Sequence, residues 1–148
     1  MTDQRRLHDA RQAILWSRVS RRRIEAAEAM TVAGDPSAAL ERHGEWLQGL
    51  QALHSSIAAV RSLMHRHAGL GAPLDPVALG DLHQRVGSIR REAAAGLKRI
   101  DDPWSPGLRC EGGALVAPNG GPAARISLVE WRHAIDAIEA WAQRSLHR

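Results

Sequence analysis

Apolar residues recur at steps of three and four along three stretches of the chain, and polar residues fill most positions between them. This spacing places each set on one stripe of an α-helix, the stripe by which neighbouring helices pack side by side. The three sets are Trp46, Leu50, Leu53, Ile57, Val60 and Met64; Leu79, Leu82, Val86, Ile89, Ala93 and Ile100; and Leu128, Trp131, Ile135, Ile138 and Ala142. The pattern therefore predicts three amphipathic helices, each with one buried face.

A fourth helix is predicted at the N-terminal end, but its apolar face is less regular. Leu7, Ala10 and Ile14 begin one stripe, whose next positions hold polar residues, and Trp16 and Val19 belong to a different one. Because the apolar face drifts around the helix, we expect this helix to bend, to pack only at its two ends or to meet a second subunit.

Capping residues mark where the predicted helices begin and end. Gly34 tolerates the left-handed conformation of a helix end, and Asp35 and Asp75 each precede a proline, which is typical of a helix start. Ser127 and Glu130 have the spacing of a capping box. The predicted helices cover about 3–33, 36–68, 76–100 and 127–147.

The segment 101–126 separates the last two predicted helices, and nine of its twenty-six residues are Pro or Gly. A loop of this length is usually functional or disordered. Leu115 and Val116 on one side of a turn-rich stretch, with Arg125 and Ile126 on the other, could form a short β-hairpin. The sequence thus predicts one all-α domain over 1–148, an antiparallel four-helix bundle with this loop between its third and fourth helices.

Composition agrees with one intracellular domain. The chain has 148 residues, 44% of them apolar, and neither Tyr nor Phe. The single cysteine, Cys110, cannot form an internal disulfide, and no segment resembles a signal peptide or a membrane span. We therefore expect a cytoplasmic protein, or one inside a viral or other assembly, that does not associate with a membrane.

The formal charge of +4 is concentrated in the first predicted helix. Its arginines could contact nucleic-acid phosphates or an acidic protein surface, or could form a solvated helix face. Trp104 in the loop is a further candidate, since it either caps the end of the bundle or anchors a partner, and the rarity of exposed tryptophan favours capping. The predicted interaction residues are Trp16, Arg18, Arg21, Arg22, Arg23 and Trp104.

Eight histidines raise the question of a metal site. His43, His54 and His65 recur every eleven residues on one helix face, but successive members are about 16 Å apart along the axis, too far to share one metal ion. A site would need ligands from other helices, so no cofactor is predicted, and the alternative metal ligands are His43, His54, His83 and His133.

Arg61 and His67 form the one short pattern with a catalytic counterpart. Their spacing resembles the Arg-x4-6-His pattern of helical ribonucleases in toxin systems. That resemblance implies that Arg61 binds phosphate and His67 moves a proton while the ribose hydroxyl attacks. Six residues along a helix leave the two side chains about 120° apart.

Taken together, the residues favour a non-catalytic protein that acts by association, as a homo-oligomer or as an adaptor or structural component that binds another protein. The alternatives are a nucleic-acid-directed effector of the ribonuclease type, with Arg61 and His67 as catalytic residues, and a histidine-based metal-binding bundle.

Overall fold

The computed structural model describes residues 2–97, 108–117 and 124–147. In these ranges it has four α-helices, a short 3-10 helix and three strands. They are α1 (Thr2–Ala29), α2 (Pro36–Arg66), η1 (Ala68–Leu70), α3 (Pro76–Leu97), β1 (Arg109–Glu111), β2 (Ala114–Val116), β3 (Arg125–Ser127) and α4 (Leu128–Leu146). The predicted helical class is confirmed, whereas the sheet corrects the expectation of an all-α fold. Trp104 and the predicted end of the third helix at residue 100 lie outside the described residues.

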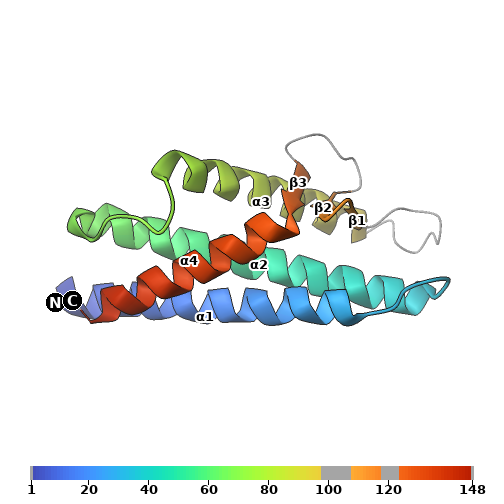
Figure 1. Ribbon diagram of the computed structural model, residues 1–148, viewed down its shortest axis with the longest axis horizontal. Coiled ribbons are helices and arrows are strands. Elements are labelled where there is room, and N and C mark those ends of the chain that lie inside the picture. The colour runs from blue at the N-terminus through green and yellow to red at the C-terminus, as the bar shows by residue number, and fades with distance from the viewer. Residues whose placement is uncertain (1, 98–107, 118–123, 148) are drawn as a thin grey trace.

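The helices lie side by side with alternating directions (Figure 1). Helix α1 packs along α2 and α4, and α2 packs against α3 on another of its sides. Helix α4 crosses over the first two helices, so the start of α1 and the end of α4 lie at the same end of the molecule (Figure 1). None of the helices within the described ranges is both long and apolar enough to cross a membrane.

Mostly small residues, together with Ile24, form the buried face of α1. They follow one another at steps of three and four, and none of them is exposed: Ala10, Ala13, Ser17, Ser20, Ile24 and Ala27. The predicted drift of this face is therefore wrong, because two serines continue the stripe on which the alanines begin. Small side chains let helix backbones approach closely, so α1 packs along its length rather than only at its two ends.

Hydrogen bonds make the burial of these serines possible, since a buried hydroxyl without a partner destabilises the fold. Ser17 Oγ donates to the carbonyl of Ala13 at 2.7 Å and lies 2.8 Å from the hydroxyl of Ser56 on α2. Ser20 Oγ donates to the carbonyl of Gly49 on α2 at 2.9 Å.

Trp131 of α4 closes the junction of three helices. Its indole Nε1 donates to Ser20 Oγ at 2.8 Å, and its ring centroid lies 5.9 Å from that of Trp46. Where this ring crosses α2 the chain has Gly49, and a Cβ at that position would stand 2.9 Å from Trp131 Cζ2. The absence of a side chain at residue 49 is therefore what admits the indole.

The sheet has the order β1-β2-β3 with both pairs antiparallel. Leu115 pairs with Ile126 and Val116 with Arg125, which confirms the predicted hairpin. Strand β1 was not predicted, and it reaches β2 through a turn at Gly112 and Gly113, whose φ values of 57° and 75° favour glycine.

The predicted helix starts are confirmed. Asp35 accepts hydrogen bonds from the backbone of Ser37 and Ala38, and Asp75 accepts one from Ala78. Ser127 Oγ accepts from Glu130 N at 3.4 Å, which is one half of the expected capping box.

The carboxylate of Glu130 is used differently from the capping-box expectation. It binds Arg85 of α3 through two hydrogen bonds of 2.7 Å each. This pair therefore ties the start of α4 to the middle of α3.

The tight junction at Gly49 generates a stability prediction. Gly49→Ala places a methyl group against the buried Trp131 ring and should lower the free energy of unfolding by about 1–3 kcal/mol. The matched control is Gly44→Ala on the same helix, where an added Cβ meets nothing within 4 Å. This control should stabilise by up to about 1 kcal/mol through helix propensity. Urea unfolding followed by circular dichroism measures both, and equal stabilities would contradict the close contact.

Candidate functional site

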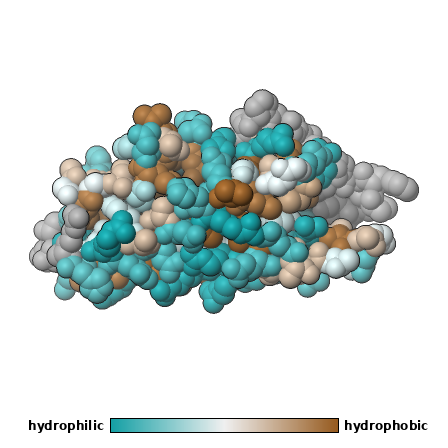
Figure 2. All heavy atoms as spheres, viewed as in Figure 1, coloured by the Kyte–Doolittle hydropathy of each residue, from teal (hydrophilic) through white to brown (hydrophobic). Residues whose placement is uncertain are grey.

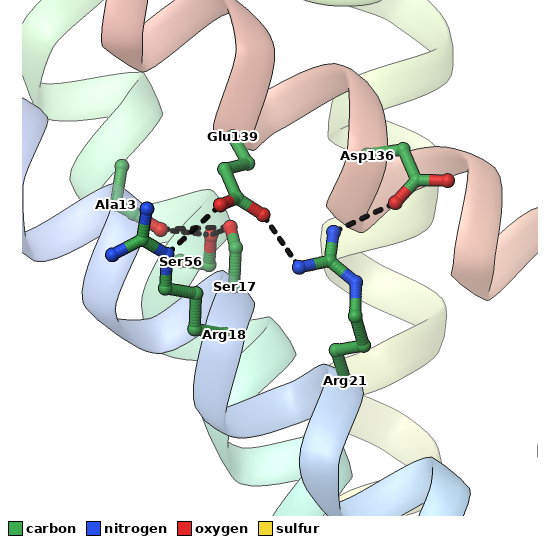
Figure 3. Close-up of polar contacts among 7 residues, drawn as sticks. All are labelled: Ala13, Ser17, Arg18, Arg21, Ser56, Asp136 and Glu139. Carbon is green, nitrogen blue, oxygen red and sulfur yellow. Dashed lines mark hydrogen bonds and ion pairs between the residues drawn. The ribbon is translucent and has the colours of Figure 1, made fainter.

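The predicted interaction arginines of α1 mostly bind other helices of the same chain (Figure 3). Arg18 Nε donates to Glu139 at 2.9 Å, and Arg21 donates to Glu139 at 2.6 Å and to Asp136 at 2.7 Å. Arg23 lies 3.1 Å from Glu45 on α2. These three side chains therefore hold α1 to α4 and α2.

Glu139 is the centre of the α1–α4 contact. Although burial alone would raise its pKa, hydrogen bonds from Arg21 and Arg18 hold the pKa of this carboxyl below its usual value. Arg22 by contrast is exposed, and Trp16 is half-buried. Among the predicted interaction residues of this helix, Trp16 and Arg22 are thus the two that no ion pair holds to another helix in the part of the chain that the structure describes.

This arrangement predicts different roles for two adjacent arginines. Arg21→Gln removes the contacts with Glu139 and Asp136 and should lower the free energy of unfolding by about 1 kcal/mol. Arg22→Gln removes the same formal charge at an exposed position and should change it by less than about 0.5 kcal/mol. Urea denaturation compares them, and equal effects would show that the ion pairs add nothing measurable to stability.

A second group of basic side chains gathers where α2 and α3 face each other. We call it the α2–α3 basic cluster, and it consists of His54 and Arg61 from α2 with His83, Arg90 and Arg91 from α3. The rings of His54 and His83 are stacked, with centroids 4.4 Å apart and an angle of 17° between their planes. Arg61 Nη1 lies 3.0 Å from His83 Nδ1.

The contact with Arg61 fixes the proton on His83. A guanidinium group can only donate, so His83 Nδ1 accepts and the ring proton belongs on Nε2. That Nε2 is buried, and so is Nε of Arg90, and neither has a hydrogen-bond partner in the part of the chain that the structure describes. Buried donors without a partner destabilise the protein, so these two are candidates for contact with a ligand.

Gly87 lies between the two helices inside this cluster. A Cβ built on Gly87 would stand 3.5 Å from Arg91 Nη1 and 3.6 Å from His54 Nε2. These distances are ordinary van der Waals contacts, so one basic group from each helix lies beside the α3 backbone at Gly87.

The electrostatics of the cluster favour an anion. Burial lowers the pKa of His54, and the charges of His83, Arg90 and Arg91 lower it further. Burial likewise lowers the pKa of His83, with additional effects from Arg61 and Arg90. All the charged groups that shift these two imidazoles are basic, so a bound anion would find complementary charge there.

The alternative metal ligands are not gathered in one place. His54 and His83 are adjacent, but His43 accepts a hydrogen bond from the backbone of Leu108 at 3.1 Å and His133 is exposed on α4. Within residues 2–97, 108–117 and 124–147, no three His, Cys, Asp or Glu side chains lie close enough to hold a metal ion. Arg61 and its neighbours would also repel a cation.

The two residues of the ribonuclease-like pair have different neighbours. Arg61 contacts His83 on α3, whereas His67 stands at the C-terminal end of α2 and its backbone N–H donates to Leu63. The sequence pointed to His54, His83 and Arg61 for separate reasons, and only the packing of α3 on α2 makes them one cluster.

Comparison with known proteins adds no assignment: no family model, no curated protein and no solved structure matches this chain.

Three histidines with lowered pKa values make the stability of the protein depend on pH. Burial lowers the pKa of His43, His54 and His83, so below about pH 6.5 the unfolded chain binds more protons than the folded one. The free energy of unfolding should therefore fall as the pH drops from 7.5 to about 5.5. His83→Gln should reduce this fall and the control His65→Gln, at an exposed position, should not. Urea titrations across this pH range test it, and identical slopes in both variants would contradict it.

Proposed function

We propose that this chain is a non-catalytic binding protein whose α2–α3 basic cluster contacts an anionic partner, and that this partner is nucleic acid. One observation carries the proposal: two buried donors without partners, on His83 and Arg90, lie among basic groups that no carboxylate is seen to neutralise in the described ranges. Phosphate groups accept such hydrogen bonds and supply the opposite charge.

The kind of side chain supports nucleic acid over an acidic protein. Arginine guanidinium groups bind phosphates, and arginine and histidine planes also stack on unpaired bases. The cluster offers both features, because the exposed Arg61 and Arg91 flank the stacked imidazoles of His54 and His83. A single-stranded RNA or DNA is therefore the partner that matches this chemistry best.

Self-association, the role favoured by the sequence, has weaker support. Among the residues whose burial is described, the large exposed apolar ones are Leu15, Leu40, Val77 and Val129, one on each helix. On the face seen in Figure 2, hydrophilic residues predominate and hydrophobic ones stand in small separate groups. Apolar residues scattered singly are ordinary at protein surfaces, whereas a stable interface needs a continuous patch. A homo-oligomer formed through Trp16 remains a prediction that light scattering can test. The cytoplasm or the interior of an assembly remains the predicted location.

Ribonuclease activity is the second candidate, and the contact between Arg61 and His83 favours it. Since His83 Nδ1 already accepts from Arg61, the neutral His54 is the better candidate for a general base acting on a ribose hydroxyl. An active protein would cut RNA without metal, leave 2′-deoxy substrates intact and lose activity in His54→Gln.

The binding proposal predicts measurable losses at the cluster. Fluorescence anisotropy with a labelled single-stranded RNA should show roughly tenfold weaker binding for Arg61→Gln or Arg90→Gln, because each loses a charged hydrogen bond to phosphate. Arg22→Gln lowers the net charge by the same amount at an exposed position on α1, outside the cluster. This variant should bind nearly as well as the unmodified protein.

Three outcomes of that titration would overturn the proposal. The first is an affinity below detection at low salt, and the second is an equal loss in the Arg22 variant, which would indicate charge attraction without a site. The third is cleavage of the RNA, which would make the protein an enzyme. Light scattering after size exclusion, with and without RNA, reports whether the bound protein is a monomer.

A further inference from the structure

We infer that the α2–α3 basic cluster is a receptor for one phosphate group, held by His83, Arg90 and the guanidinium groups beside them. This inference deepens the proposed function and rests on it for the biological source of the phosphate. The phosphodiester of a nucleic-acid backbone and a free or terminal phosphate share this chemistry, so the experiment below separates the two.

The number of donors and their origin favour a tetrahedral oxyanion over a carboxylate. Three guanidinium groups and two imidazoles approach from two helices, and a phosphate presents more acceptor oxygens than the two of a carboxylate. His83 Nε2 and Arg90 Nε are the donors without partners, and they lie on one flank of α3 because seven residues span about two turns. An oxygen reaching this flank would satisfy groups that are otherwise buried without partners.

Two further basic nitrogens, one from each helix, lie beside Gly87. They are Arg91 Nη1 and His54 Nε2, at 3.5 and 3.6 Å from the position of a Cβ. Since a phosphate places its oxygens in several directions, one group can bridge donors from α2 and α3.

Binding of this anion should change the titration of both rings. The charged groups acting on them are Arg61 from α2 and Arg90 and Arg91 from α3, together with the two imidazoles themselves. All of these disfavour a proton on His54 or His83 in the free protein. A bound phosphate reverses part of that effect, so the complex holds a proton more readily and forms more tightly as the pH falls.

Imidazole NMR of the isotopically labelled protein tests the inference directly, with dimethyl phosphate as the probe, because this diester does not itself titrate near neutral pH. We expect the pKa of His54 and His83 to rise by about one unit, which corresponds to roughly tenfold tighter binding to the protonated form. His65 and His133 are exposed and serve as internal controls that should not move. Inorganic phosphate replaces the diester in a second arm, and acetate at matched ionic strength replaces it in a third.

Variants separate a site from general screening. Arg61→Gln and Arg90→Gln should abolish the rise, while Arg22→Gln should leave it intact. A response to the diester supports a nucleic-acid backbone as the source, and a response to inorganic phosphate alone supports a free or terminal phosphate. No rise with either phosphate, a rise of equal size with acetate, or equal rises at His65 and His133 would overturn the inference.

Failure of the inference can be told apart from failure of the proposed function. If both imidazoles respond to phosphate but no RNA or DNA binds, the phosphate receptor stands and the nucleic-acid partner is wrong. If RNA binds and neither ring responds, the partner stands and its contact lies elsewhere on the surface.

Discussion

The junction of Ser20, Gly49 and Trp131 is the contact on which the rest of this fold depends. One serine hydroxyl donates to the α2 carbonyl and accepts from the α4 indole, so a single small side chain joins three helices. The indole reaches that hydroxyl only because α2 has no side chain at residue 49. Removal of the Ser20 hydroxyl would leave the buried indole N–H of Trp131 without this partner, and a side chain at residue 49 would overlap the ring.

Close packing of α1 at this junction also determines which carboxylates the arginines of α1 contact. Because its small residues face α2 and α4, its arginines emerge beside the carboxylates of those helices, and Arg21 reaches Glu139 and Asp136. Three arginines of the most basic segment of the sequence, Arg18, Arg21 and Arg23, are thereby paired with carboxylates of the same chain. Charge along a sequence is therefore a poor guide to charge on a surface, since neutralisation depends on which helix lies alongside.

Much of the helical framework could be predicted because its signals are local. Asp35, Asp75 and Ser127 cap helices with their own neighbours in sequence, and Leu115 pairs with Ile126 across one turn. The α1 stripe was missed because a hydropathy pattern counts serine as polar, although Ser17 is fully buried and hydrogen-bonded. Strand β1 was missed because its residues, Arg109, Cys110 and Glu111, are all exposed, so no apolar position marks it as a strand.

Neither helix alone predicts the α2–α3 basic cluster, because the cluster depends on how the two helices face each other. His54 directly follows the core residue Leu53, and His83 directly follows the core residue Leu82, so each stands on the same rotational side of its apolar stripe. Two facing helices that run in opposite directions bring those matching sides together, as α2 and α3 do (Figure 1). The acidic partner of α3, Glu130, binds Arg85 on its opposite flank. One flank of α3 is thus neutralised by the start of α4, while the other presents histidine and arginine to α2.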